Sequence, residues 1–390
     1  MKHALVLSLS LSFLACERGG VPEPQPVATE QPAAVEPEEG SSAEVEPDTE
    51  AAPAAEPAPA PEPEPEPEPE VDPMDAVREA VAGRGALPEA ARELFWGSVE
   101  DDAPEVLNAT RPDLEGRHYL YCDELNLQLW YERVRDLGGG YAGVGSDQAY
   151  TFIGWQRPQL VWLTDYDPWI RALHRIYHAF FEDAAELQGF RDRWEEENQA
   201  DARAFLEARF EGDPDLELIL LVFHEARFKV WRRLHRIRRM ARAHDVPTFV
   251  SDEETYAFVR ETVMQGRVRY MVANLLDDEA LRAIGEVQRT LEVPLRVLYL
   301  SNAEDYWAYP DTFRENMRAL HFDGSSVILR TNAAKRRNGD YRYNAQSATN
   351  FVAWLDQPYV ERISDIWVRK WITEEDDIPS TFIDEAPFER

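Results

Sequence analysis

The sequence predicts an α/β protein with a doubly wound, mostly parallel sheet and a helical insertion. Between residues 140 and 330, short and continuously apolar runs alternate with segments whose apolar residues recur at helical spacing. Strands of a parallel sheet are buried on both faces, so they read as unbroken apolar runs between amphipathic helices. The alternation stops from Glu182 to Asp252, where polar helical sequence predicts the insertion.

The elements of the alternation follow from this spacing. Asp167 and Pro168 suit the cap and first turn of one helix, and a long helix over Leu216–Ala243 should belong to the insertion. At least five strands are expected, at Tyr141–Gly145, Leu160–Leu163, Val268–Val272, Leu295–Leu300 and Ser326–Arg330. The other expected helices are Gln148–Trp155, the one after Asp167, Glu253–Met264, Glu279–Leu291 and Asp311–Leu320.

The segments around this alternation set the expected domain limits. Residues 74–118 predict a helical lead-in, with helices at Met74–Ala82 and Pro88–Trp96. A further helix is expected at Leu125–Val134, ended by the glycines at 138–140. The main domain is placed at residues 119–335, its insertion at 182–252, and a C-terminal extension at 336–390.

The first sixteen residues predict a lipoprotein signal peptide. Lys2 precedes an apolar run, Ala4–Leu14, which is shorter than the roughly 20 residues needed to cross a bilayer. Ala15 and Cys16 supply a small residue before a cysteine, so lipidation is expected at Cys16. The alternative is a signal peptide with an incidental cysteine. Lipidation would anchor the chain in the cell envelope, on the periplasmic face or cell surface of a bacterial membrane.

Residues 17–73 predict a disordered linker. They are rich in Glu, Pro and Ala, contain no aromatic residue and reach a strict Pro-Glu alternation at residues 61–70. Such a segment cannot bury enough apolar surface to offset its ordering entropy. Proline and charge repulsion extend it, so it could act as a spacer on the order of 100 Å long.

Charge and cysteine content narrow the possible partners. The net charge is −33, which argues against a nucleic-acid partner because phosphates need a positive surface. The chain has two cysteines, and lipidation of Cys16 leaves only Cys122. No intramolecular disulfide is then possible, and Cys122 is expected to be buried and inert.

Polar residues and glycines follow the predicted strands, where ligands bind in doubly wound sheets. Asp147 could equally cap a helix, and Asp165 could accept hydrogen bonds from two ribose hydroxyls. Their coincidence at one edge predicts a pocket. The candidates for cofactor binding are Gly143, Gly145, Asp147, Gln148, Asp165 and Asn274, and those for the reacting end are Asn302, Glu304 and Tyr306.

Three blocks of sequence carry a resemblance to a known group of proteins. They are residues 139–151 (GGYAGVGSDQAYT), residues 163–167 (LTDYD) with Leu173-His174, and residues 297–306 (VLYLSNAEDY). Over residues 119–332 the chain resembles a family of uncharacterised bacterial proteins. That family is similar to class I S-adenosylmethionine-dependent methyltransferases in its Rossmann-like fold.

The resemblance implies roles for the candidate residues. Gly143, Gly145 and Gln148 would line the methionine side of S-adenosylmethionine, and Asp165 would bind its ribose. Asn302, Glu304 and Tyr306 would lie at the reacting end. Active methyltransferases usually have an acid two residues before the first glycine and a glycine after the second. This sequence has Tyr141 and Asp147 there.

Two functions follow from these features. The first is an envelope lipoprotein whose methyltransferase-like domain binds a small molecule or an envelope protein without catalysis. The alternative is an S-adenosylmethionine-dependent methyltransferase. Export disfavours the alternative because S-adenosylmethionine is a cytoplasmic metabolite. No metal is expected: His174 and His178 are four residues apart but have no evident third ligand.

The segment Arg227–Arg242 holds seven arginines and one lysine among apolar residues. A basic amphipathic helix of this kind could dock on anionic lipid or on the acidic linker. Alternatively, its arginines pair with acidic residues of the domain itself.

Overall fold

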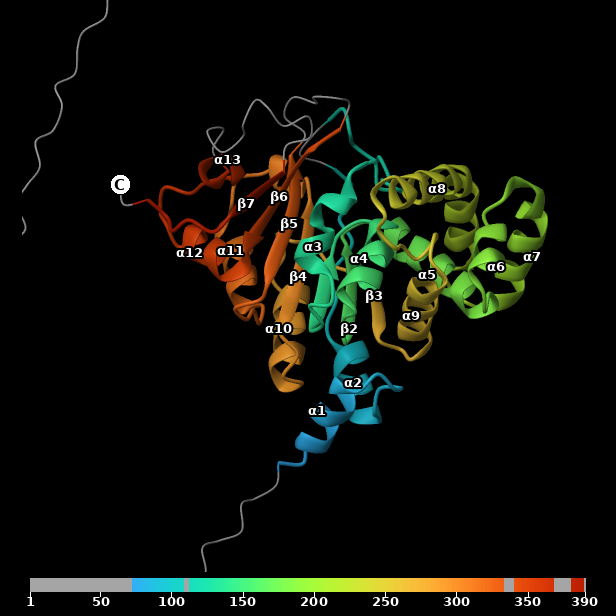
Figure 1. The fold of residues 1–390 in the computed structure, drawn as a ribbon, viewed down its shortest axis with the longest axis horizontal. Helices are drawn as coiled ribbons and strands as arrows, with labels where there is room; N and C mark the ends of the chain where they lie inside the picture. Colours follow the sequence, from blue (N-terminus) through green and yellow to red (C-terminus); the bar gives the residue numbers. More distant parts are fainter. Residues whose placement is uncertain (1–71, 109–111, 333–339, 368–379, 389–390) are drawn as a thin grey trace, which may run out of the picture. The chain divides into compact units, whose positions relative to one another are not determined.

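The core of the protein is a seven-stranded sheet, described by a computed structural model (Figure 1). Its strand order is β3-β2-β1-β4-β5-β6-β7. The first five strands in sequence are mutually parallel, β6 runs antiparallel to β5, and β7 is parallel to β6. The strands are β1 (Gly140–Gly143), β2 (Leu160–Asp165), β3 (Val268–Val272), β4 (Leu295–Ser301), β5 (Val327–Asn332), β6 (Arg342–Ser347) and β7 (Ser380–Ile383).

The structure describes residues 72–108, 112–332, 340–367 and 380–388, all within one compact unit that begins at Glu68. The predicted signal peptide, Cys16 and nearly all of the 17–73 linker lie outside the described residues. Among the residues described, no helix is both long enough and apolar enough to span a membrane.

Successive side chains of each strand pack on opposite faces of the sheet, which produces two separate cores. Tyr141 of β1 belongs to the first core and Ala142 to the second. The first face is covered by η1 (Leu127–Trp130), α3 (Tyr131–Val134), α4 (Gln148–Gln156), α5 (Pro168–Asp183), α8 (Leu216–His244) and α9 (Glu253–Met264). The second is covered by α1 (Asp75–Ala82), α2 (Glu89–Gly97), α10 (Ala280–Thr290), α11 (Asp311–Ala319), α12 (Ala348–Leu355) and α13 (Ile363–Ile366).

The predicted doubly wound, mostly parallel α/β sheet is therefore confirmed, and the order β3-β2-β1-β4-β5 is consistent with a Rossmann-like layout. All five predicted strands form. Strands β6 and β7 were not predicted; they lie in the 336–390 segment and enlarge the sheet to seven strands. Among the described strands, β6 and β7 are the two that run antiparallel to the other five.

The segment between α5 and α9 is helical, as predicted. It contains α6 (Leu187–Asp192), η2 (Glu196–Asn198), α7 (Gln199–Arg209) and α8, and Figure 1 shows α6 and α7 on the opposite side of the molecule from α11 and α12. Helix α8 packs against α5, and Val222, Val230 and Ile237 are buried on its inner side. That packing fixes which residues of α8 face outward.

The lead-in helices α1 and α2 pack on the second face of the sheet. Phe95 of α2 meets Trp162 of β2 edge to face, with ring centroids 5.1 Å apart. The buried guanidinium of Arg267, just before β3, donates to the carbonyls of Val81 and Gly83 at the end of α1. These donors satisfy carbonyls that a helix end leaves unpaired, so the lead-in is tied to the sheet.

One helix prediction was wrong in form. Instead of a continuous helix over Leu125–Val134, the chain makes a short 3-10 turn, η1, and one α-helical turn, α3. The apolar spacing was correct, since Leu127, Trp130 and Val134 are buried. The turn is anchored from a distance: the backbone N–H of Asn126 donates to the hydroxyl of Tyr343, 217 residues along the chain.

Candidate functional site

The carboxyl edge of the parallel strands holds the predicted site residues. Strand β1 lies between β2 and β4, and the chain reverses its direction of winding between β1 and β4. In open α/β sheets this switch point is the usual place for a ligand. The structure arranges the nine candidates in three groups: the loop after β1 with Asp165, Asn274 after β3, and the residues after β4.

The loop after β1 is held closed by protein groups. Gly145 has φ +85°, a conformation that favours glycine, and its backbone N–H donates to Asp165 at 2.9 Å. The buried Gln148 side chain folds back on the loop, donating to the carbonyl of Val144 at 2.7 Å and accepting from the N–H of Ser146 at 3.1 Å.

His174 closes the same loop from helix α5. Burial lowers the pKa of His174 to about 4, so the ring is neutral at physiological pH. Its Nε2 lies 2.9 Å from the carbonyl oxygen of Gly145, and its Nδ1 lies 3.0 Å from the hydroxyl of Tyr150. Because a carbonyl only accepts, Nε2 carries the proton and Nδ1 accepts from Tyr150. His178 contacts a different group, the hydroxyl of Tyr270.

Tyr141 fills the space beside Gly143. A Cβ atom on Gly143 would lie 2.5 Å from the Tyr141 hydroxyl, so only glycine fits at this position. The Tyr141 side chain is fully buried, and its hydroxyl has no hydrogen-bond partner in the described part of the chain. Burial raises its pKa well above the ordinary value, which keeps it neutral.

Asp165 ends β2 as predicted, but its carboxylate already accepts two backbone hydrogen bonds. One comes from Gly145 and the other from Asp167, at 3.0 Å. Burial, together with the charge of Asp167, raises the pKa of Asp165 to about 7. Asp167 caps α5 by accepting from the N–H of Trp169, which confirms the predicted cap, and it also contacts His118 at 2.8 Å.

Asp147 stands at the N-cap position of α4, but the predicted side-chain cap was wrong. The structure gives it no side-chain capping bond. Its carboxylate instead accepts from the backbone N–H of Cys122 at 2.8 Å and from Nε of Arg233 at 2.7 Å. Asp147 and Arg233 are almost entirely inaccessible to solvent, so this ion pair joins the β1 loop to helix α8.

Glu124 is the central residue that the sequence did not predict. It is 1 % exposed, and its carboxylate accepts from the hydroxyls of Tyr299 at 2.7 Å, Ser301 at 3.1 Å and Thr331 at 2.7 Å. Burial raises the pKa of Glu124 to about 6, although these hydrogen bonds oppose the increase. The hydroxyl residues in β4 and β5 were the available signal, but nothing local links them to residue 124.

Cys122 lies beside this carboxylate. Its sulfur is 3.7 Å from Glu124, and burial raises the pKa of the thiol well above its ordinary value. A thiol held in its neutral form is a poor nucleophile, in agreement with the predicted inertness. The residue as a whole is only partly buried, which differs from the prediction.

The three candidates after β4 do not contact the β1 loop group through any hydrogen bond among the described residues. The amide of Asn302 lies 3.3 Å from the hydroxyl of Tyr306. Glu304 is 3 % exposed, forms a buried ion pair with Arg330 at 2.7 Å and accepts from the hydroxyl of Tyr309 at 2.6 Å. Glu304 is thus held by its neighbours inside the second core.

The end of β3 is covered by the lead-in. The backbone N–H of Asn274 donates to Asp101 at 2.8 Å, and the Asn274 side chain bonds within its own loop, to Leu276 and Asp277. Asp101 also accepts from the backbone N–H of Ala280, so it caps α10 from a distant part of the chain.

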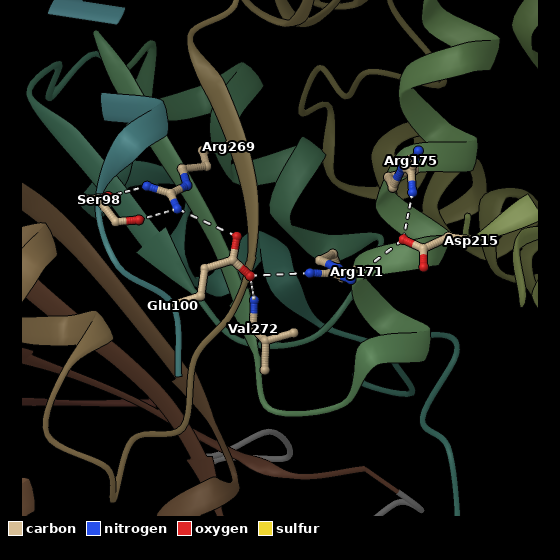
Figure 2. A network of polar contacts seen from close by, with 7 residues as sticks. All are labelled: Ser98, Glu100, Arg171, Arg175, Asp215, Arg269 and Val272. Carbon is tan, nitrogen blue, oxygen red and sulfur yellow. Dashed lines mark hydrogen bonds and ion pairs between the residues drawn. The ribbon is translucent and has the colours of Figure 1, made fainter. Parts of the chain in front are cut away.

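Figure 2 shows the neighbouring network in which Glu100 connects the lead-in to β3 and α5. Its carboxylate accepts from the backbone N–H of Val272 and pairs with Arg269 and Arg171. Arg171 in turn pairs with Asp215, just before α8. Residues 98–101 are therefore attached to the sheet and, through α5, to the insertion.

These contacts have one common feature: side chains of the segment 98–124 satisfy groups at the ends of the strands. Glu100 and Asp101 accept hydrogen bonds from the end of β3 and the loop that follows it. His118 contacts Asp167 after β2, and Glu124 accepts from hydroxyl groups of β4 and β5. The described residues contain no cluster of three or more His, Cys, Asp or Glu side chains suited to a metal ion.

Fold and site together define a doubly wound α/β protein with a Rossmann-like layout, whose sheet edge is closed by its own side chains. The chain belongs to the family described as a domain of unknown function, DUF7790, whose model matches residues 119–380. No curated protein matches the sequence.

Proposed function

We propose that this chain is a membrane-anchored envelope lipoprotein whose methyltransferase-like domain binds a small molecule or an envelope protein and does not catalyse. The observation that carries the proposal is the closed sheet edge. Gly145 uses its N–H for Asp165 and its carbonyl for His174, and Gln148 occupies the rest of the loop. A cofactor on this loop would have to displace these internal contacts.

The ribose role of Asp165 is also poorly supported. A carboxyl whose pKa is about 7 is protonated in a large part of the molecules near neutral pH. A protonated carboxyl accepts fewer hydrogen bonds than a carboxylate, and two backbone donors already compete for it. To bind two ribose hydroxyls strongly, Asp165 would have to lose its proton and release the backbone N–H groups of Gly145 and Asp167, and the closed loop opposes that release.

Tyr141 gives independent support. The resemblance places an acid at this position in active methyltransferases, where it would pair with the cofactor's ammonium group. Here the position holds a neutral, fully buried phenol whose ring lies against Gly143. A phenol that stays neutral supplies no charge for that pairing.

The alternative function is an S-adenosylmethionine-dependent methyltransferase. The parallel strand order and an acid at the end of β2 favour it. A methyltransferase works largely by positioning the acceptor against the methyl group, so a loop that opens on binding would be compatible with it.

Calorimetric titration of the chain from residue 17 onward with S-adenosylmethionine and S-adenosylhomocysteine separates the two functions. The proposal expects no heat at millimolar concentrations of either compound. Micromolar binding that is lost in Asp165→Ala but retained in Asp356→Ala, an exposed acid away from all candidate residues, would contradict the closed sheet edge, and transfer of a labelled methyl group to an acceptor would then establish the alternative.

A further inference from the structure

Helix α8 carries an exposed face that the sheet-edge site does not use. Residues at helical intervals face outward along it, from Leu221, 48 % exposed, through Phe228, 56 % exposed, to Arg232, Arg239 and Arg242. The opposite face is buried against α5 and the first core. The first half of the outward face therefore mixes these two apolar side chains with the exposed acidic residues Glu217 and Glu225, and the second half is strongly basic.

Most of the positive charge on this face is not neutralised. Among the eight basic residues of segment 227–242, Arg233 pairs with Asp147 and Lys229 lies 3.9 Å from Glu225. The expectation that the arginines pair with the acidic domain thus holds for Arg233 but not for the outward face. No carboxylate of the described residues forms an ion pair with Arg232, Arg236, Arg238, Arg239 or Arg242.

The mutual repulsion of these arginines is visible at Arg238. Burial and the nearby charges of Arg191 and Arg242 lower its pKa, and Glu195 opposes the effect only in part. Glu195 is itself engaged, since it accepts from the indole N–H of Trp231 at 2.6 Å. Although the net charge of the chain is −33, no carboxylate of the described residues forms an ion pair with Arg238.

The basic half of the face is also hollowed. A depression of about 380 Å³ is lined by five arginines, Trp231 and His235. A second one, of about 250 Å³, lies beside it between α8 and the segment before α7, and its lining includes Phe228 and Trp231 together with the acidic residues Glu195 and Glu196. Guanidinium groups bind phosphate oxygens in a bidentate manner, and aromatic rings suit a membrane interface.

We propose that the outward face of α8 is a docking surface for a membrane that contains anionic phospholipids. The arginines contact lipid phosphates, while Leu221 and Phe228 enter the interfacial layer. Charge complementarity supports the ligand class, and the two exposed apolar side chains on the same face favour a lipid surface over a dissolved phosphate. This contact does not depend on lipidation of Cys16.

Vesicle co-sedimentation tests the proposal with the chain from residue 17 onward, which lacks the signal sequence and Cys16 but keeps every described element. We expect binding to vesicles of phosphatidylglycerol and phosphatidylcholine, and none to phosphatidylcholine alone. Replacing Arg232, Arg236 and Arg239 by Gln should weaken binding on the order of 100-fold, because each basic residue near an anionic surface contributes about 1 kcal/mol. Added salt should weaken it as well.

A matched control replaces three exposed arginines outside α8, Arg92, Arg135 and Arg203, by Gln. It changes the net charge equally and should bind like the unaltered chain. The proposal is overturned if the unaltered chain does not bind phosphatidylglycerol vesicles, or if both triple variants lose binding to the same extent. It is also overturned if inorganic pyrophosphate binds through these arginines while vesicle binding is unaffected by Phe228→Ser, which identifies a dissolved-phosphate site.

Discussion

Asp147 and Arg233 form an ion pair from which water is excluded. Burying two charges costs desolvation free energy, and their mutual attraction offsets this cost only if both partners are present. Arg233 also donates to the backbone carbonyl of Glu124, so one guanidinium supports the β1 loop and the segment that covers the sheet edge. At the scale of single residues, this contact links the candidate site to the insertion.

Arg233→Met should destabilise the fold by roughly 3–5 kcal/mol, because it leaves the Asp147 carboxylate buried without a partner. Urea unfolding measures the change. The neighbouring Arg232→Met removes the same side chain from an exposed position and should change the unfolding free energy by less than about 0.5 kcal/mol. Equal effects of the two substitutions would refute the assignment of Arg233 to the interior.

Glu124 makes stability depend on pH in an unusual direction for a carboxyl group. Its pKa is raised from 4.5 to about 6, so the folded state binds the proton more tightly than the unfolded state. The stabilisation is present below pH 4.5 and is lost as the pH rises through 6. The loss amounts to about 2 kcal/mol.

The corresponding measurement compares the unaltered chain with Glu124→Gln. Between about pH 5 and about pH 7.5, the melting temperature of the unaltered chain should fall relative to the variant, which keeps a neutral group at this position. Asp165, whose pKa is raised to about 7, contributes in the same direction in both proteins and cancels in the comparison. A pH-independent difference between them would contradict the role given to Glu124.

At the scale of elements, two helices approach each other through a glycine. A Cβ atom on Gly285 of α10 would lie 2.0 Å from the carbonyl oxygen of Ala319, the last residue of α11. Backbone at that distance cannot yield by a side-chain rotation. The sequence showed Gly285 only as a small residue inside a predicted helix, whereas the structure identifies it as the contact between two helices.

Gly285→Ala should therefore destabilise the fold by about 1–3 kcal/mol, the usual range for overpacking, despite alanine's better helix propensity. Gly97→Ala is the matched control, because no atom lies within 4 Å of the added Cβ at this end of α2. It should be neutral or slightly stabilising in chemical denaturation. A stabilising Gly285→Ala would mean that α10 and α11 do not pack this closely.

At the scale of the whole molecule, the proposed function depends on residues 1–16 as much as on the sheet. If the predicted signal sequence and cysteine act as proposed, the acidic α/β domain is displayed from a membrane. The proposed location would separate it from the cytoplasmic S-adenosylmethionine pool, in keeping with the proposed non-catalytic role.

Cys16→Ser should abolish incorporation of labelled palmitate. At high salt, which screens the α8 contact, the variant chain should move to the soluble envelope fraction, whereas at low salt the α8 face should keep part of it on anionic membranes. A single added lipid chain binds membranes only marginally, so full anchoring requires several chains or a second contact such as the α8 face. Cys122→Ser serves as the control and should leave labelling unchanged. If Cys16→Ser still incorporates labelled palmitate, Cys16 is not the lipidation site and the proposed anchor is wrong.

The sequence by itself determined the layers of the fold and the edge where polar groups gather. Val268–Val272 and Glu253–Met264 were predicted with their observed bounds, because the periodicity of burial is a local property. Asp165 and Asn274 were placed after their strands for the same reason. The order of elements along the chain then brings strand ends to one edge.

Only the tertiary structure decided what those polar groups bind. Asp147 meets Arg233, 86 residues away, and Glu124 meets Thr331, 207 residues away. Such pairs depend on how helices pack across the sheet, and no local pattern encodes that packing. The same residues that the sequence presented as an open pocket are satisfied by one another, because a buried polar group without a partner costs free energy.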